Sequence, residues 1–392
     1  MAEIDKYINQ IICGDALETL KLLPDSSIDE VVTSPPYWGL RDYQVDGQLG
    51  LEQTFDEYIF KLCNIFDEVK RVLKPTGTLF VNLGDTYGGS GNGSWNAPVE
   101  KRGKQYRKTI NIDQEYLAPP RKSSQNLAKS LCLIPFRFAI EMQNRGWIIR
   151  NVIIWHKPNA MPQSVKDRFT VDFEYIFFFV KSKRYYFEQQ FESLVYFDKR
   201  GNQRIEYNGK LSKAKKNNIK GIQTAYMGQN QELGKNKRCV WSIPTKPFDE
   251  AHFATYPEDL VKPMILAGCP EYVCTKCGKP REKIYARELV KSGKPSDRKV
   301  AIINNVSDTS CFRTNDEYTF VENGYTDCGC NAEFTKGIVL DPFGGAMTTA
   351  VVAKKLNRNW IMIEINPEYI EIGKKRLSQI PDTLFTIPPQ EE

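Results

Sequence analysis

The sequence predicts an α/β fold, a doubly wound and mostly parallel sheet with helices on both faces. Residues 7–83 alternate short apolar, β-branched runs with segments of helical spacing, in the order strand, helix, strand, helix, strand. Residues 337–377 repeat the pattern as strand, Gly-rich turn, helix, strand and helix. Such alternation is typical of parallel strands joined by helical crossovers, and it predicts a ligand crevice at the carboxyl ends of the strands.

The segments between these two stretches are predicted in the same way. Residues 126–146 predict a helix that ends at Asn-Arg-Gly, and residues 256–268 predict another. Residues 147–157 and 173–187 are rich in β-branched and aromatic side chains and predict two strands that pair antiparallel. Residues 86–128 are rich in Gly, Ser, Asn, Pro and Lys, which predicts either a mobile functional loop, able to close over a substrate, or a disordered one.

The charge of the chain is weakly basic. Lys and Arg exceed Asp and Glu by 54 to 48, a net charge of +6. This excess is compatible with a polyanionic partner and too small to identify one. Basic stretches at 101–108 and 210–220 have the composition of solvated loops. The sequence contains no run of about 18 apolar residues and no signal-peptide pattern, which predicts a cytoplasmic protein without a membrane partner.

The tetrapeptide Ser34-Pro35-Pro36-Tyr37 directly follows the β-branched segment DEVVT, residues 29–33, so it lies at the carboxyl end of a predicted strand. Two successive prolines remove two N–H donors and leave carbonyl groups as fixed acceptors. The Ser34 hydroxyl and the Pro35 carbonyl can accept the protons of an amine, and the Tyr37 ring offers a face on which a flipped base can stack. A Pro-Pro turn with Tyr37 in the core is the structural alternative.

A second candidate site lies near the C-terminus. Gly344 and Gly345 form a turn after a predicted strand, a helix begins near Thr348, and the next strand ends at Glu364. Glycines let the backbone approach a nucleotide-like ligand, and an acidic residue at the end of the next strand can accept hydrogen bonds from both ribose hydroxyls. The spacing favours a cofactor site, although a tight strand-to-helix turn needs glycine in any case.

Ten cysteines in a chain expected in a reducing compartment argue against a disulfide framework. Four that lie in apolar runs are predicted to pack in the core: Cys13, Cys63, Cys132 and Cys239. Cys274 and Cys277 form a CxxC pair, and Cys328 and Cys330 form a CxC pair. Four such thiolates can bind a structural zinc ion, and reduced cysteines in a surface insertion are the alternative.

The ordered motifs resemble those of the DNA amino-methyltransferases, in the β-type arrangement in which the catalytic motif precedes the cofactor motif. Similar motifs extend over most of the chain: CGDALETLKLLPDSSIDEVVTSPPYW, LKPTGTLFVNLGD, GWIIRNVIIWHKPNAMP, FATYPEDLVKPMILAGC, VLDPFGGAMTT and IMIEINPEY. The resemblance implies the Rossmann-like fold of the S-adenosylmethionine-dependent methyltransferases, S-adenosylmethionine as cofactor and double-stranded DNA as partner. It implies that Ser34, Pro35 and Tyr37 are catalytic and that Pro36 holds the turn. The implied cofactor-binding residues are Asp15, Asp341, Phe343, Gly345, Thr348 and Glu364.

The resemblance also implies an organisation into five segments. Residues 1–190 are the catalytic half of the methyltransferase domain, with the mobile loop 86–128, and residues 191–245 are an inserted target-recognition segment. Residues 246–270 are a helix that returns the chain to the domain. Residues 271–335 are a cysteine-rich insertion, and residues 336–392 are the cofactor-binding half.

The chain departs from the family pattern at the cofactor turn. The family usually has Ser-Gly after the position of Gly345, and this chain has Ala346 and Met347. A Met347 side chain could crowd the cofactor or reshape the turn. A catalytically impaired DNA-binding protein of the same fold is therefore one alternative.

The reaction implied is in-line transfer of a methyl group to the exocyclic amine of a flipped base, without a cysteine nucleophile. Family members with Ser at the first motif position often act on N4 of cytosine and those with Asp more often on N6 of adenine, so Ser34 favours cytosine. Adenine is the alternative, and a planar amine of RNA or of a protein amide is a third. A cognate restriction endonuclease is a further partner that the family implies, whereas the target sequence and the oligomeric state do not follow from the chain.

Overall fold

The computed structural model describes residues 3–40, 43, 45–88, 127, 129–192, 195–197, 203–205, 235–246, 255–291 and 317–381. The chain divides into two compact units. The first consists of Met1–Glu188, Cys239–Pro280 and Cys330–Ile387, and the second of Gln189–Arg238, Arg281–Gly329 and Pro388–Glu392. Most of the predicted loop 86–128 and of the predicted recognition segment 191–245 lies outside the described residues.

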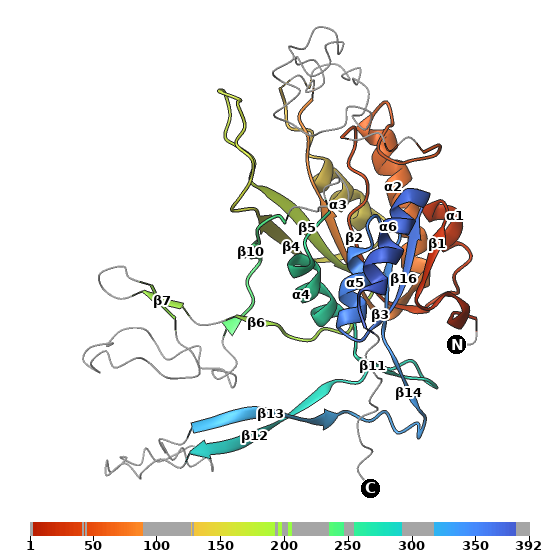
Figure 1. Cartoon of the computed structure of the whole chain (residues 1–392), viewed down its shortest axis with the longest axis vertical. Helices are drawn as coiled ribbons and strands as arrows, with labels where there is room; N and C mark the ends of the chain where they lie inside the picture. The colour runs from red at the N-terminus through yellow and green to blue at the C-terminus, as the bar shows by residue number, and fades with distance from the viewer. Residues whose placement is uncertain are drawn as a thin grey trace. The chain divides into compact units, whose positions relative to one another are not determined.

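The described part of the first unit has one large sheet, with strand order β1-β16-β15-β2-β3-β5-β4-β10 (Figure 1). Its strands are β1 (Gln10–Cys13), β16 (Asn359–Glu364), β15 (Ile338–Asp341), β2 (Ile28–Thr33), β3 (Leu73–Leu83), β5 (Phe173–Val180), β4 (Ile148–His156) and β10 (Val240–Ser242). All neighbouring pairs are parallel except the two that involve β5. The mostly parallel sheet and the antiparallel pairing of β4 with β5 are confirmed.

Helices cover both faces of this sheet, as the sequence predicts (Figure 1). One face carries α1 (Ala16–Leu20), α2 (Phe55–Val72) and α3 (Ile134–Asn144), and the other carries α4 (Glu258–Gly268), α5 (Thr348–Lys355) and α6 (Pro367–Ser378). Because both faces are covered, the central strands are buried on both sides, and β2 is buried along its whole length. The helix α2 begins where the Thr54 hydroxyl accepts the Glu57 N–H at 3.2 Å.

The winding of the sheet reverses between β15 and β2. From β15 the chain runs outward to β16, and from β2 it runs the other way to β3, although β15 and β2 are parallel neighbours. Loops that leave the carboxyl ends of two such strands diverge, which opens a crevice above them. The predicted catalytic tetrapeptide follows β2 and the predicted cofactor turn follows β15, so the topology brings the two together.

Two cysteine predictions are wrong. Cys63 and Cys132 are buried, but Cys13 and Cys239 are exposed. Cys13 ends β1 and Cys239 directly precedes β10, and these two strands are the edges of the sheet. A strand at the edge of a sheet has a neighbouring strand on one side only, so the side chains of an apolar run there are less covered than those of a central strand.

The described chain also contains four shorter strand pairs: β6 (Phe191–Glu192) with β9 (Lys235–Asn236), β7 (Val195–Phe197) with β8 (Gln203–Ile205), β11 (Tyr272–Cys274) with β14 (Phe334–Lys336), and β12 (Lys283–Lys291) with β13 (Glu317–Tyr325).

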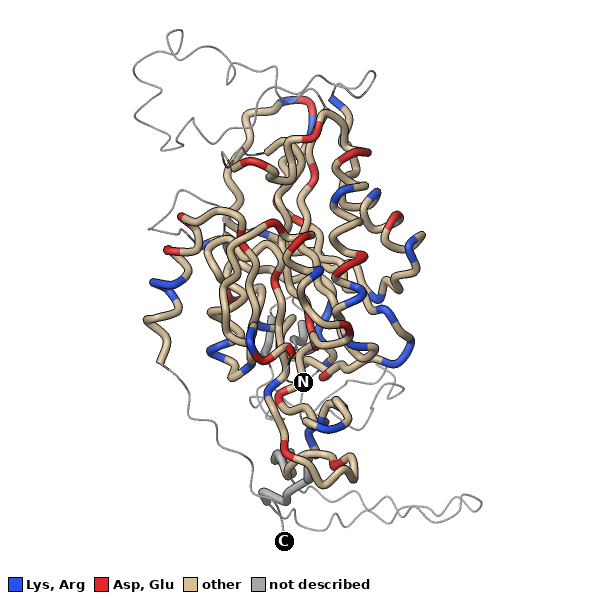
Figure 2. Tube along the Cα trace, turned by 90° about the vertical axis from the view of Figure 1, so that its right-hand side faces the viewer, with Lys and Arg blue, Asp and Glu red and all other residues tan. Residues whose placement is uncertain are grey.

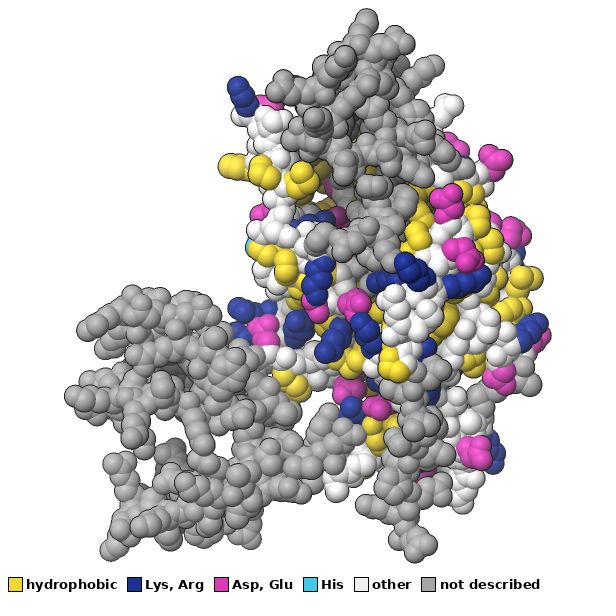
Figure 3. All heavy atoms as spheres, viewed as in Figure 1, with side chains coloured by type: hydrophobic (Ala, Val, Ile, Leu, Met, Phe, Trp, Pro, Cys, Tyr) yellow, Lys and Arg dark blue, Asp and Glu magenta, His cyan; other side chains and the backbone are white. Residues whose placement is uncertain are grey.

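Figure 2 shows acidic and basic residues interspersed along the described backbone. Lys and Arg gather over α4 and α5 on the face drawn in Figure 3, with carboxylates among them, such as the exposed pair Lys355–Glu258 at 2.6 Å. Among the described helices, none is long and apolar enough to cross a membrane.

Candidate active site

A cavity of about 750 Å³ lies at the carboxyl ends of the central strands. Both sequence-predicted sites contribute to its wall. The lining includes the tetrapeptide Ser34–Tyr37, the pair Gly14 and Asp15, the turn 342–346 with Thr348, and residues 364–366. One cavity therefore holds the candidate amine site and the candidate cofactor site.

The tetrapeptide is held by its second proline. The Pro36 carbonyl accepts the Tyr58 hydroxyl of α2 at 2.9 Å, so this acceptor is occupied. The Ser34 hydroxyl has only long contacts, 3.4 Å from Asn82 Nδ2 and 3.5 Å from the Tyr37 hydroxyl. Hydrogen bonds this long are weak, so the Ser34 hydroxyl can exchange them for a shorter hydrogen bond to a ligand with little loss of free energy.

The Tyr37 hydroxyl lies in a partly buried polar network. It donates to Glu174 Oε2 at 2.6 Å and accepts from Asn82 Nδ2 at 2.8 Å. Glu174 also forms an ion pair with Lys157. Burial, and then the charge of Glu174, raise the pKa of Tyr37 well above its usual value, so the phenol stays protonated. The ring is fixed at the cavity wall as a neutral aromatic surface.

Gly84, just past the end of β3, leaves room for this ring. A Cβ at Gly84 would lie 2.6 Å from Tyr37 Cε2. Contacts this short do not occur between carbon atoms, so any side chain at position 84 would displace the ring.

The cofactor turn is organised by Glu364 at the end of β16. Its Oε2 accepts the Gly345 N–H at 2.7 Å, and its Oε1 accepts the Asn366 N–H at 2.8 Å. Burial raises the pKa of this carboxyl group, and the two N–H donors oppose that rise. Gly345 has φ of +50°, and the nearest atom to a Cβ built there is 3.9 Å away, so the turn faces open space.

Asp341, at the end of β15, is fully buried and accepts four hydrogen bonds. Its Oδ1 accepts from the Thr33 hydroxyl at 2.6 Å and from the Phe343 N–H at 3.0 Å. Its Oδ2 accepts from the hydroxyl groups of Thr349 at 2.7 Å and Tyr256 at 2.9 Å. Burial raises the pKa of Asp341 and these donors lower it. The carboxylate thus joins the end of β2, the cofactor turn, α5 and the segment before α4.

Asp15 lies at the cavity wall and caps α1, where its Oδ1 accepts the Glu18 N–H at 3.0 Å. The Gly14 N–H donates to the Glu364 carbonyl at 3.0 Å, which places the end of β1 beside the end of β16. Asp15, which follows β1, and Glu364, which ends the neighbouring strand β16, therefore lie on the same wall of the cavity.

Met347 does not enter the cavity. Its backbone has φ of +62° at the N-terminus of α5, and its side chain is fully buried in the core. A Cβ built on Gly373 of α6 would lie 2.1 Å from Met347 Cγ, so the glycine provides the space that the methionine fills. The crowding of the cofactor considered from the sequence is therefore not observed.

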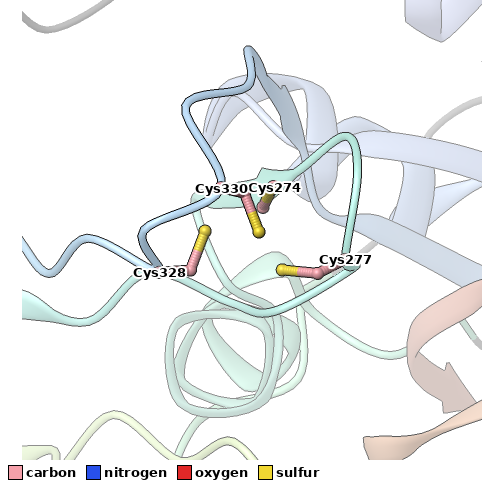
Figure 4. A group of neighbouring side chains, drawn as sticks. All are labelled: Cys274, Cys277, Cys328 and Cys330. Atoms are coloured by element: carbon pink, nitrogen blue, oxygen red, sulfur yellow. The ribbon is translucent and has the colours of Figure 1, made fainter.

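The four candidate zinc ligands converge. The sulfur atoms of Cys274, Cys277, Cys328 and Cys330 all lie within 4.8 Å of one another. Figure 4 shows the side chains of two separate chain segments directed toward one point.

Sequence reasoning missed the residues that position the site: Thr33, Asn82, Lys157, Glu174 and Tyr256. A signal for two of them was present. Asn82 and Glu174 are single polar residues inside the apolar runs LFVNL and FEYIFFFV, and an isolated polar residue in a buried strand needs a partner.

Comparison with known proteins places this geometry in a family. Residues 28–274 and 330–375 match the sequence model of the N6/N4 DNA methylases. Type II methyltransferase M.Cfr9I of Citrobacter freundii is 34% identical over 365 residues, which cover 93% of this chain and 86% of the relative. Type II methyltransferase M.XycI of Xanthomonas campestris pv. cyanopsidis is 33% identical over 364 residues, with the same two shares of 93% and 86%.

Among solved structures, the PvuII DNA methyltransferase (cytosine-N4-specific) superposes with a TM-score of 0.50 and 16% identity. The superposition covers 96% of this chain and 88% of that protein. At this identity the likeness is one of fold, the Rossmann-like fold that the motifs imply.

The contact between Met347 and Gly373 can be tested with a double-mutant cycle in urea. We expect Gly373→Ala to lower the free energy of unfolding by about 1–3 kcal/mol, because the new methyl group overpacks the core. In the Met347→Ala background the same change should cost no more than about 1 kcal/mol, because the Cγ that clashes is gone and only the contact with the Cβ of residue 347, at 3.0 Å, remains. An equal cost in both backgrounds would mean that the two side chains do not compete for one space.

Proposed function

Because the chain belongs to the β class of DNA amino-methyltransferases, we propose that it transfers a methyl group from S-adenosylmethionine to N4 of cytosine in double-stranded DNA. The observation that carries the proposal is the single cavity lined by Ser34–Tyr37 and by the turn at Gly345. A direct transfer requires the amine and the methyl donor side by side, because reactivity depends on their positioning.

The residues at the turn fit S-adenosylmethionine. When bound, this cofactor supplies an electrophilic methyl group on its sulfonium sulfur. We assign the ribose hydroxyls to Glu364, whose carboxylate is fixed by two backbone N–H groups and retains lone pairs. Asp15, Phe343, Gly345 and Thr348 complete the wall of this subsite. Asp341 is a positioning residue, since both of its oxygens already accept two hydrogen bonds from the protein.

The amine is held at the tetrapeptide. The Ser34 hydroxyl and the Pro35 carbonyl accept hydrogen bonds from its two N–H groups, which leaves the nitrogen lone pair to attack the methyl group. As the N–C bond forms, the bond between the methyl group and the sulfonium sulfur breaks with its electron pair going to sulfur, and the methylated amine releases one proton. The Tyr37 ring, fixed by Glu174 and Asn82, offers the surface on which the flipped base stacks. Pro36 contributes by anchoring the turn to Tyr58.

The choice of cytosine over adenine rests on the acceptor at position 34. Ser34 is neutral, and the carboxylate of this network, Glu174, is already paired with Lys157 and with the Tyr37 hydroxyl. The amine therefore meets a hydroxyl and a carbonyl rather than a carboxylate. This arrangement supports the family association of serine with N4 of cytosine.

The identity of the methylated base can be measured directly. Genomic DNA from a bacterial host without amino-methyltransferases of its own, expressing this chain, should yield N4-methylcytosine when digested to nucleosides and analysed by mass spectrometry. A matched host expressing Tyr37→Ala should yield at least about tenfold less, because the stacking surface is lost. N6-methyladenine in place of N4-methylcytosine would contradict the choice of base, and methylation of RNA or protein alone would contradict the DNA substrate.

The pH dependence of cofactor binding tests the role of Glu364. Burial raises the pKa of its carboxyl group, so the ionised acceptor is lost earlier on acidification than an exposed glutamate would be. We expect the affinity for S-adenosylmethionine, measured by calorimetry, to fall as the pH drops from about 8 to about 5. Glu364→Gln should bind about tenfold or more weakly at pH 8 and lose most of this pH dependence. Unchanged affinity in Glu364→Gln would remove Glu364 from the ribose site.

A further inference from the structure

We propose that Cys274, Cys277, Cys328 and Cys330 bind one structural Zn²⁺ ion that fastens the two ends of an inserted segment, residues 278–327. None of these four cysteines lines the cavity at the carboxyl ends of the central strands.

The placement of the thiols matches a tetrahedral S₄ site. With Zn–S bonds of about 2.3 Å, a tetrahedron has S···S separations of about 3.8 Å. The four sulfur atoms already lie within 4.8 Å of one another, so closure needs shifts of less than about 1 Å. Cys274 is buried and Cys277 is exposed, which gives the site an inner wall and an entry path for the ion.

The backbone holds the first cysteine pair in place. Cys274 ends β11 and pairs with Phe334 of β14, and the Thr275 N–H donates to the Glu333 carbonyl at 2.9 Å. The Gly278 N–H donates to the Cys274 carbonyl at 3.0 Å, closing a turn that brings Cys277 back toward Cys274. The positions of Cys274 and Cys277 are thus set by main-chain pairing, which lowers the ordering that metal binding must supply.

The cysteines also mark the ends of the insertion. The stretches that match the family stop at Cys274 and resume at Cys330. Cys277, Cys328 and the whole segment between them therefore lie outside the part shared with the family model. A metal bound to both pairs closes this segment into a loop at its base, and such a cross-link stabilises mainly by restricting the unfolded chain.

The binding of zinc to the four cysteines releases protons. Each cysteine coordinates as a thiolate, so four thiol protons pass to solvent when the ion binds. No oxidant or reductant is involved.

The test is the metal content of the full chain, purified without chelator after expression in zinc-containing medium. We expect about one equivalent of zinc, falling below about one tenth in Cys277→Ser and in Cys328→Ser. Cys239→Ser is the matched control, because Cys239 is also exposed but lies outside the cluster, and it should keep the full equivalent. The thermal midpoint should fall in the two cluster variants and on treatment of the wild type with a strong chelator.

A second measurement uses the wild-type chain alone, so its result does not depend on whether the variants fold. Cobalt added to the zinc-depleted wild type should give the intense visible bands and the thiolate charge-transfer absorption of a tetrahedral S₄ site. A folded and methylating chain without zinc, a disulfide among the four cysteines, or zinc retained in the Cys277→Ser/Cys328→Ser double variant would each overturn the proposal. Because DNA methylation is assayed separately, failure of the metal site leaves the proposed reaction standing.

Discussion

One buried carboxylate, Asp341, connects the two halves of the candidate active site. It ends β15 at the point where the winding of the sheet reverses, and its four hydrogen bonds reach the end of β2, the cofactor turn, α5 and the segment before α4. Burial of a carboxylate is costly unless its oxygens are fully hydrogen-bonded, and here each oxygen has two donors. The need to supply all four hydrogen bonds to the Asp341 carboxylate therefore fixes the distance between the tetrapeptide and the cofactor turn.

A second network acts on the other side of the cavity. Glu174 and Asn82 hold the Tyr37 hydroxyl, Lys157 pairs with Glu174, and Gly84 leaves space for the ring. These contacts pass through strands β3 and β5, which pair antiparallel. The antiparallel strand thus has a functional consequence, since it places Glu174 opposite the end of β3.

The sequence allowed the general architecture to be predicted, because strand and helix periodicity, glycine turns and strand-end motifs are local signals. The tetrapeptide and Glu364, both in the wall of the cavity, were predicted in this way. The partners of Tyr37 and Asp341 were not, since Thr33, Glu174 and Tyr256 come from segments far apart in the chain and only the sheet order brings them together. Met347 shows the same limit. Whether its side chain faced the cofactor or the core depended on Gly373, a residue on another helix.

The most direct test of this account is Asp341→Asn, compared with Asp29→Asn. Asp29 is also a buried carboxylate that joins β2 to β15, but at the opposite end of the strands, where it accepts the Ile338 N–H at 2.9 Å. The measurements are the dissociation constant for S-adenosylmethionine and the single-turnover rate of methyl transfer to DNA at saturating cofactor. We expect Asp341→Asn to worsen both by about tenfold or more, and Asp29→Asn to lower stability while leaving both within about threefold. An Asp341→Asn variant with a wild-type transfer rate at saturating cofactor would show that this carboxylate does not couple the two sites.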